Sequence, residues 1–176
     1  MLPVGPLMIE HRLIEKLMPH IRRATEAARR EGRIDPSFVE FALDFIRMYA
    51  DRCHHGKEED ILFRELDRKA LSPDHRKVID ELVEEHRIGR KAVGELRKAM
   101  EAYRKGDAAA LAAIVERLEW LADFYPAHIE KEDKRFFLPV MDYFSPEERE
   151  ALIEEEAEFD RKFIHEIYRD RLAEWA

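Results

Sequence analysis

Two stretches of the chain repeat a short pattern of metal-binding residue types. "CHHGKEED" runs from Cys53 to Asp60 and "HIEKEDKRFF" runs from His128 to Phe137, and both place a histidine four residues ahead of a glutamate. Residues four apart are neighbours on the surface of a helix. Each stretch can therefore present an imidazole and a carboxylate side by side, and both groups are natural ligands of a divalent metal.

Helical phase predicts that several of these side chains point into a core. At about 100° per residue, an apolar stripe can be followed along each helix. The side chains that fall on such stripes are His11, His86 and His128, the last together with Glu132. Asp133 lies nearer the edge of its stripe. Three helices are therefore each expected to send a histidine inward.

The helix that carries Cys53 is harder to interpret by phase. A stripe of Phe41, Phe45, Met48, Phe63 and Leu66 would put His55 and Glu59 on the inner face. His54 and Glu58 then lie towards the flank. Gly56 separates the two pairs, and a bulge there could shift the phase by one residue. Phase alone favours His55 and Glu59 and leaves the other pair open.

A lone histidine on an apolar face is usually a hydrogen-bonded core residue, and His20, His75 and His165 belong to no pattern. Four inward histidines with two glutamates are different, because without a cation they would leave lone pairs and negative charge in low dielectric. The donors outnumber the four that a structural zinc uses. Mixed imidazole and carboxylate ligands inside a helical bundle suit a pair of iron or manganese ions bridged by glutamates. Cys53 is interpreted as a packing residue.

The elements that must position these residues are long helices. Helix breakers and capping residues divide the chain into five helical segments, at about 7–30, 36–69, 73–105, 108–143 and 146–173. The expected N-caps are Asp35, Ser72, Asp107 and Ser145. Short connections predict an all-α, up-down-up-down four-helix bundle with an additional C-terminal helix, in a single domain over residues 1–176. We expect the fifth helix to pack on the outside of the bundle or to form a homodimer contact.

Four motifs resemble one known family. "IEHRLIEKL", "HHGKEEDILF", "EEHRIGR" and "HIEKEDKRFF" are similar, in this order, to the hemerythrin-like HHE cation-binding domain, over about residues 7–143. The resemblance implies His54 with Glu58 and His128 with Glu132 as ligands, and iron-sensing members add the residue after the first histidine. The implied metal ligands are His11, His54, His55, Glu58, His86, His128 and Glu132. Glu59 stays the fallback bridge.

The match to true hemerythrin is looser. Its third helix carries two ligand histidines one turn apart, whereas the positions four before and four after His86 are Leu82 and Arg90. His55 could supply the missing nitrogen from the neighbouring helix. Hemerythrin also has an aspartate five residues after the fourth-helix histidine, and Asp133 occupies that spacing, although phase and the HHE pattern prefer Glu132.

The resemblance implies a non-haem di-iron centre, oxo- or hydroxo-bridged, in which manganese or zinc could substitute. With Glu58 and Glu132 both bridging, three histidines on one iron and two on the other leave one position open for dioxygen, peroxide or nitric oxide. Neutral imidazoles should disfavour the high-valent states that attack C–H bonds. We therefore expect a protein that binds or senses a small molecule rather than an enzyme. The alternatives are a stress-related di-iron enzyme, for peroxide reduction or iron–sulfur repair, and a metal-stabilised helical interaction module.

Composition excludes several other classes. The formal net charge is -8 and no basic stripe is present, so a nucleic-acid partner is not expected. Cys53 is the only cysteine, so the chain can form no internal disulfide. No apolar run approaches the about 20 residues that span a bilayer. Because the N-terminal stretch lacks the basic start of a signal peptide, we expect a cytoplasmic location.

Overall fold

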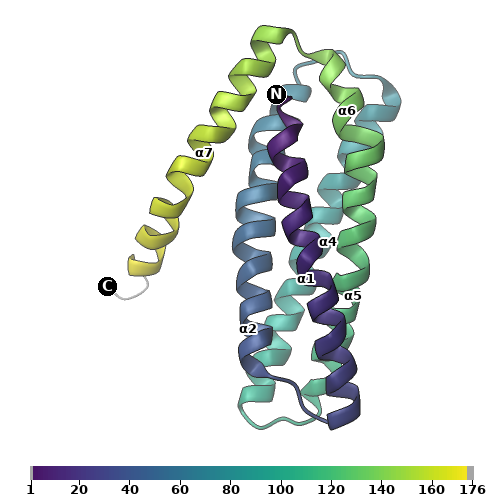
Figure 1. The fold of residues 1–176 in the computed structure, drawn as a ribbon, viewed down its shortest axis with the longest axis vertical. Coiled ribbons are helices and arrows are strands. Elements are labelled where there is room, and N and C mark those ends of the chain that lie inside the picture. Colours follow the sequence, from purple (N-terminus) through teal and green to yellow (C-terminus); the bar gives the residue numbers. More distant parts are fainter. Residues whose placement is uncertain (1, 174–176) are drawn as a thin grey trace.

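The computed structural model describes residues 2–173, with side chains described as far as residue 169. In that range it consists of helices joined by turns and short loops, without a strand. Four helical segments run antiparallel as a bundle, and a fifth lies outside it (Figure 1). The first segment is α1 (Val4–Glu31) and the third is α4 (Pro73–Arg104). The second comprises α2 (Pro36–Phe45), the π-helical η1 (Ile46–His55) and η2 (Glu58–Phe63), and α3 (Arg64–Leu66). The fourth comprises α5 (Ala110–Lys131), the π-helical η3 (Glu132–Phe136), α6 (Phe137–Val140) and the 3₁₀ turn η4 (Met141–Tyr143). The fifth is α7 (Pro146–Ala173). The predicted fold class is confirmed.

The helix ends follow the capping residues. The side chain of Asp35 accepts a hydrogen bond from Ser37 N, and that of Ser72 accepts one from His75 N. At the start of α7, Ser145 and Glu148 each bond the other's backbone N–H, at 3.2 and 2.9 Å, as a capping box. Asp107 also accepts a backbone N–H, but α5 begins only at Ala110.

The bundle has two separate apolar clusters. One contains Ile14, Val93 and Ile129, and the other contains Leu7, Leu82 and Phe136. Each of the four bundle segments passes from one cluster to the other. The residues midway along a segment must therefore fill the layer between the clusters. On α1, His11 lies between Leu7 and Ile14 and is completely buried.

The stripe predicted for the second helix is wrong in its first half. Phe41 is 57% exposed, whereas Val39 and Ala42 are fully buried. The reason is the π-helical conformation of η1 and η2. A π-helix has wider turns than an α-helix, so a single α-helical stripe cannot be extended from Leu66 back to Phe41.

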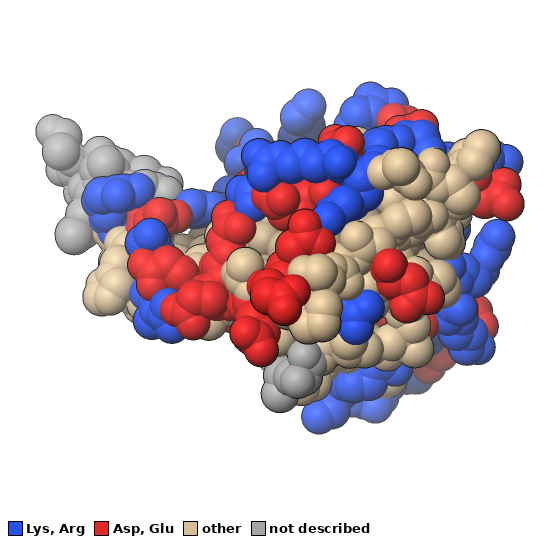
Figure 2. Space-filling view, turned by 90° about the horizontal axis from the view of Figure 1, so that it is seen from above, with Lys and Arg blue, Asp and Glu red and all other residues tan. Residues whose placement is uncertain are grey.

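The fifth helix packs against the second segment of its own chain and diverges from it towards the C-terminus (Figure 1). Figure 2 shows acidic side chains gathered on this end of the molecule, with lysines and arginines around them. Glu155 pairs with Arg64 at 2.7 Å, and Glu148 pairs with Lys69 at 2.6 Å. The role of this helix in a homodimer stays a prediction.

None of the helices between residues 2 and 173 is long and apolar enough to cross a membrane.

The close approach of α7 depends on a missing side chain. A Cβ at Gly56 would lie 3.1 Å from Cζ of Phe159, whereas a Cβ at Gly94 would meet nothing within 4 Å. We expect Gly56→Ala to push the Phe159 ring away, and overpacking of this kind costs about 1–3 kcal/mol. Gly94→Ala should instead stabilise its helix by up to about 1 kcal/mol.

Urea unfolding of the two variants measures the difference, and amide hydrogen exchange should show faster exchange in α7 of Gly56→Ala alone. Equal stability of the two variants, with α7 equally protected, would contradict this account of the contact.

Candidate metal centre

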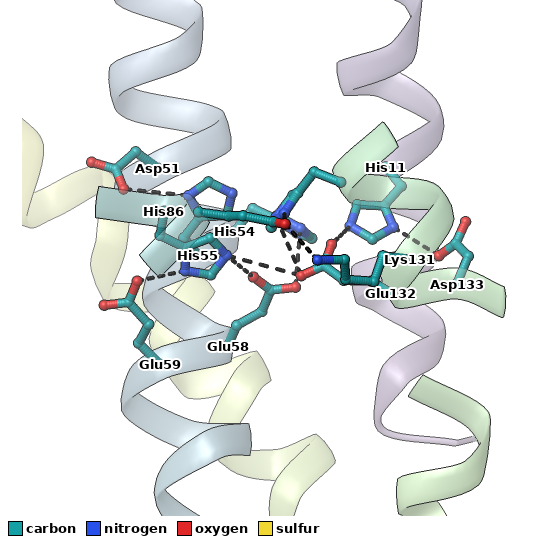
Figure 3. Close-up of polar contacts among 12 residues, drawn as sticks. His11, Asp51, His54, His55, Glu58, Glu59, His86, Lys131, Glu132 and Asp133 are labelled. Atoms are coloured by element: carbon teal, nitrogen blue, oxygen red, sulfur yellow. Dashed lines mark hydrogen bonds and ion pairs between the residues drawn. The ribbon is translucent and has the colours of Figure 1, made fainter. Parts of the chain in front are cut away.

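A layer of buried polar residues separates the two apolar clusters. The seven side chains implied as ligands all lie in it, each at most 3% exposed: His11, His54, His55, Glu58, His86, His128 and Glu132. They come from all four segments of the bundle. The six of them that Figure 3 labels point towards one another. Two unpaired carboxylates in such a place would be strongly unfavourable. Their charge must be compensated inside the layer.

The ligand atoms form two groups, and within each group they lie within 4.8 Å of one another. The first group is His55, His86 and His128. The second is His11, His54, Glu58 and Glu132. The histidines are thus divided three and two between neighbouring positions.

Each glutamate spans the two groups. The Oε1 of Glu58 lies 3.3 Å from Nε2 of His54, and its Oε2 lies 3.3 Å from Nε2 of His86. The Oε2 of Glu132 lies 3.2 Å from Nε2 of His11, and its Oε1 lies 3.3 Å from Nε2 of His128. Each carboxylate can therefore offer one oxygen to each group.

Eight atoms point into the layer without a hydrogen-bond partner among the described residues. They are Nε2 of His11, His54, His86 and His128 and the four carboxylate oxygens of Glu58 and Glu132. Charge-assisted hydrogen bonds are usually about 2.7–2.9 Å long. Two ligand atoms about 2.1 Å from one metal and at right angles to each other are about 3.0 Å apart. The observed spacing of 3.2–3.3 Å therefore fits atoms that share a cation.

Five further carboxylates lie outside the layer, and we call them the outer ring. Each contacts Nδ1 of one of the five histidines of the layer. The contacts of Nδ1 are His11 to Asp133 (2.8 Å), His54 to Glu10 (2.9 Å), His55 to Asp51 (3.4 Å), His86 to Glu59 (2.6 Å) and His128 to Glu85 (2.7 Å). An Nδ1–H that donates to a carboxylate leaves Nε2 with its lone pair free for a metal. These contacts orient all five rings.

The π-helical turns explain why two consecutive histidines reach the layer. His54 and His55 end η1, and both are at most 3% exposed. Glu58 is fully buried at the start of η2, while the side chain of Glu59 is 27% exposed and holds His86 from outside. The structure thus places Glu58 between the histidines and Glu59 outside them, the opposite of the preference from phase.

The fourth segment shows the same division of roles. Glu132 is fully buried between His11 and His128, whereas Asp133 turns outward to His11 Nδ1 and to Arg12.

On α4, Leu82 is a core residue and Arg90 bonds outer carboxylates, so neither approaches the layer as a ligand. The ring of His55 stacks on that of His86 with centroids 3.8 Å apart.

The outer ring connects to α7 through a buried lysine. Lys57 is completely buried and donates hydrogen bonds to Glu10, which holds His54, and to Asp160 on α7 at 2.8 Å. The carboxylate of Glu156 lies nearby, 2% exposed and without a hydrogen-bond partner, and burial raises its pKa to about 8. The fifth helix is therefore joined by polar contacts to a histidine of the layer.

Sequence reasoning missed the outer carboxylates Glu10, Asp51 and Glu85 and the buried Lys57. Charged residues make up 40% of the chain, so the presence of one more Asp, Glu or Lys does not indicate a functional role. Asp51 lies four residues before His55, a helical spacing that could have identified it. Glu10 and Glu85 hold histidines 44 and 43 residues away, which only the fold can reveal.

The metal-free layer binds protons tightly. For His54, burial works against the charged form, but the charge of Glu58 and the contact with Glu10 outweigh it and raise the pKa to about 10. For His86, burial is likewise outweighed by the carboxylates of Glu132, Glu58 and Glu59, which raise the pKa to about 11. Burial and the neighbouring charge of His86 instead lower the pKa of His55. The neighbouring carboxylates thus favour the protonated imidazoles of His54 and His86 when no cation is bound.

Comparison with known proteins identifies one family. A family model described as "Hemerythrin HHE cation binding domain" matches residues 2–140, from the start of α1 to the end of α6, and stops before α7. A search of curated proteins and a search of solved structures each found no match.

The raised pKa values predict how cation uptake depends on pH. A cation at Nε2 must displace the protons of His54 and His86. At His11 burial is likewise outweighed by Asp133 and Glu132, which raise its pKa, so loading at pH 7 should release at least two protons per chain. The affinity should rise as the pH increases towards about 10 and fall on acidification. Calorimetric titration of metal-free protein with Mn(II), in buffers of different ionisation enthalpy, counts the protons. Uptake without proton release would contradict the assigned charges.

Substitution of the two adjacent glutamates of η2, Glu58 and Glu59, should have very different effects on the number of bound metal ions. Glu58→Gln removes a charge from the centre of the layer and should lose at least one metal ion per chain. Glu59→Gln weakens the outer contact to His86 and the pair with Arg90 but leaves the inner carboxylates in place, so it should keep the stoichiometry, with affinity about 10–100-fold weaker. Elemental analysis and Mn(II) titration of both variants test this. Loss of metal from Glu59→Gln alone would mean that Glu59 is the bridge.

Proposed function

The chain belongs to the family of hemerythrin HHE cation-binding domains, and we propose that it holds two iron ions and binds or senses dioxygen, peroxide or nitric oxide. The proposed ligands are His55, His86 and His128 for one ion and His11 and His54 for the other. Glu58 and Glu132 would bridge the pair. The family relationship itself accounts for cation binding; the metal and the ligand are the proposal.

The observation that carries it is the set of eight buried, unpartnered atoms. Together with His55 they offer more donors than the four of a tetrahedral zinc site. A mixed set of imidazoles and carboxylates in the interior of a helical bundle is typical of iron or manganese pairs. Zinc or manganese could occupy the same ligands, but the redox and ligand-binding chemistry proposed here requires iron.

The residue types favour reversible binding over substrate oxidation. Bound iron would supply redox chemistry and an exchangeable coordination position for a small molecule. Five neutral imidazoles and only two carboxylates leave more positive charge in the layer than a carboxylate-rich site would. The group with His11 and His54 has fewer histidines, so we assign the exchangeable position to it.

Aromatic rings shield the histidines from water. The ring of Phe137 stacks on His11 with centroids 5.4 Å apart, and Phe124 stacks on His128 at the same distance. Phe63 lies parallel to His86 with centroids 6.1 Å apart. Such walls keep the dielectric low and limit access to small molecules, which suits a binding or sensing role.

Iron content and optical response test the proposal. Protein produced in iron-supplemented cells should contain about two irons per chain, since the layer divides its histidines between two positions. After anaerobic reduction, addition of oxygen should produce a visible absorption band that fades under argon. Peroxide and nitric oxide are then added to separate samples of the reduced protein.

Irreversible oxidation by oxygen combined with catalytic peroxide turnover would favour the stress-enzyme alternative. A single stoichiometric zinc, or two irons without a response to any of the three molecules, would overturn the proposed function.

A further inference from the structure

A cavity opens beside the metal centre. It has a volume of about 320 Å³ and lies between η1 and α4, with Tyr125 of α5 also in its wall. Its inner end reaches His55 and His86, and its outer part is lined by Arg47 and Arg97. A water molecule occupies about 30 Å³ of liquid, so the space equals roughly ten waters. That is far more than a diatomic molecule needs.

The outer part of the cavity carries uncompensated positive charge. Arg90, also in the wall, is committed to Asp51 at 2.7 Å and to Glu59 at 2.8 Å. Arg97 reaches only Glu101, at 4.0 Å, and Arg47 has no ion pair among residues 2–169. Two available guanidinium groups favour an anion, and their planar geometry matches a carboxylate.

The inner part offers an apolar wall and one polar group. Ile46 and Val93 line the cavity, and both are less than 10% exposed. Tyr125 is 2% exposed, and its hydroxyl makes no hydrogen bond with any described residue. The hydroxyl of a tyrosine that lines a cavity and has no partner among the described residues is available to a ligand or water that reaches it.

The extent of the cavity indicates the size of such a ligand. Arg47 and His55 lie near the two ends of η1, so the cavity follows most of this π-helical stretch. A small inorganic anion between the arginines would leave most of the 320 Å³ unfilled. A molecule with an apolar body of a few carbon atoms would fill more of it, and Gly94 leaves space because its missing side chain faces open space.

The cavity also touches the outer ring of the metal centre. Asp51, in its wall, accepts from His55 Nδ1 at 3.4 Å and from Arg90 at 2.7 Å. Arg90 in turn bonds Glu59, which holds His86 at 2.6 Å. Asp51 and Glu59 lie on the outer side of the histidines, away from Glu132 (Figure 3). A ligand in the cavity would contact groups that orient two of the rings.

We propose that this cavity binds a small organic carboxylate, with its charged end at Arg47 and Arg97 and its body extending to Tyr125, and that its binding alters the metal centre through Asp51 and Arg90. The binding step stands independently of the metal, whereas the coupling rests on the proposed function. The site is separate from the exchangeable position at His11 and His54.

Calorimetry of the metal-loaded protein with acetate, butyrate, hexanoate and inorganic phosphate tests the binding. Butyrate or hexanoate should bind more tightly than acetate, and phosphate should bind weakly or not at all. Arg47→Gln and Arg97→Gln should each weaken binding by about tenfold. Gly94→Leu should abolish it by filling the cavity.

Matched controls are Lys98→Gln, which removes one charge beside Arg97 outside the cavity wall, and Gly94→Ala, which adds only a methyl group. Both should bind as the unaltered protein does. Absence of carboxylate binding, or binding that ignores both arginine variants and Gly94→Leu, would overturn the proposal. Tighter binding of phosphate than of hexanoate would overturn the assigned ligand class.

Optical spectra of the iron-loaded protein, recorded with and without saturating carboxylate, test the coupling. We expect a shift of the iron absorption bands that is absent in Gly94→Leu. Binding without such a shift would refute the coupling alone. If the protein takes up no iron but still binds the carboxylate, the di-iron proposal is refuted and the cavity assignment stands.

Discussion

Two buried carboxylates impose the main constraint on this molecule. Glu58 and Glu132 lie fully buried between two apolar clusters, and each shares its oxygens between two histidines. Carboxylates in a low-dielectric interior are tolerated only with a compensating charge. The raised pKa values of His54 and His86 indicate that protonated imidazoles supply that charge without a cation, and a bound cation would supply it on loading. The rest of the bundle keeps these groups together and oriented.

The surrounding structure serves this constraint in layers. Each histidine turns its inner nitrogen to the centre because a carboxylate holds its outer nitrogen. Arginines and lysines then hold those carboxylates: Arg90 pairs with Glu59, and Lys57 pairs with Glu10. Through Lys57 the chain of contacts extends to Asp160 on α7, outside the part that the family model matches. The contacts of the centre thus reach from the core to the fifth helix.

The π-helical turns show how local backbone geometry decides a functional site. Wide turns tend to occur where function requires them, since they disturb the regular hydrogen bonding of a helix. Here they occur in the two segments that carry the His-x-x-x-Glu pairs, at Ile46–His55, Glu58–Phe63 and Glu132–Phe136. They bring His54 and His55 into the same layer. Ile46, Arg47 and Asp51 of the same π-helical stretch line the cavity beside α4.

Much of the fold could be predicted from the sequence, because helix caps, breakers and four-residue spacings are local signals. Asp35, Ser72 and Ser145 marked three helix starts, and the ordered motifs indicated the family. The sequence also determined that histidines and glutamates meet in one layer, since burial without partners would be too costly. Only the tertiary structure decided which glutamate of the adjacent pair faces inward, because that choice depends on π-turns that α-helical phase cannot represent. It also decided the outer carboxylates, because Glu10 and Glu85 reach histidines on other helices, and no local pattern encodes a contact between residues more than forty positions apart.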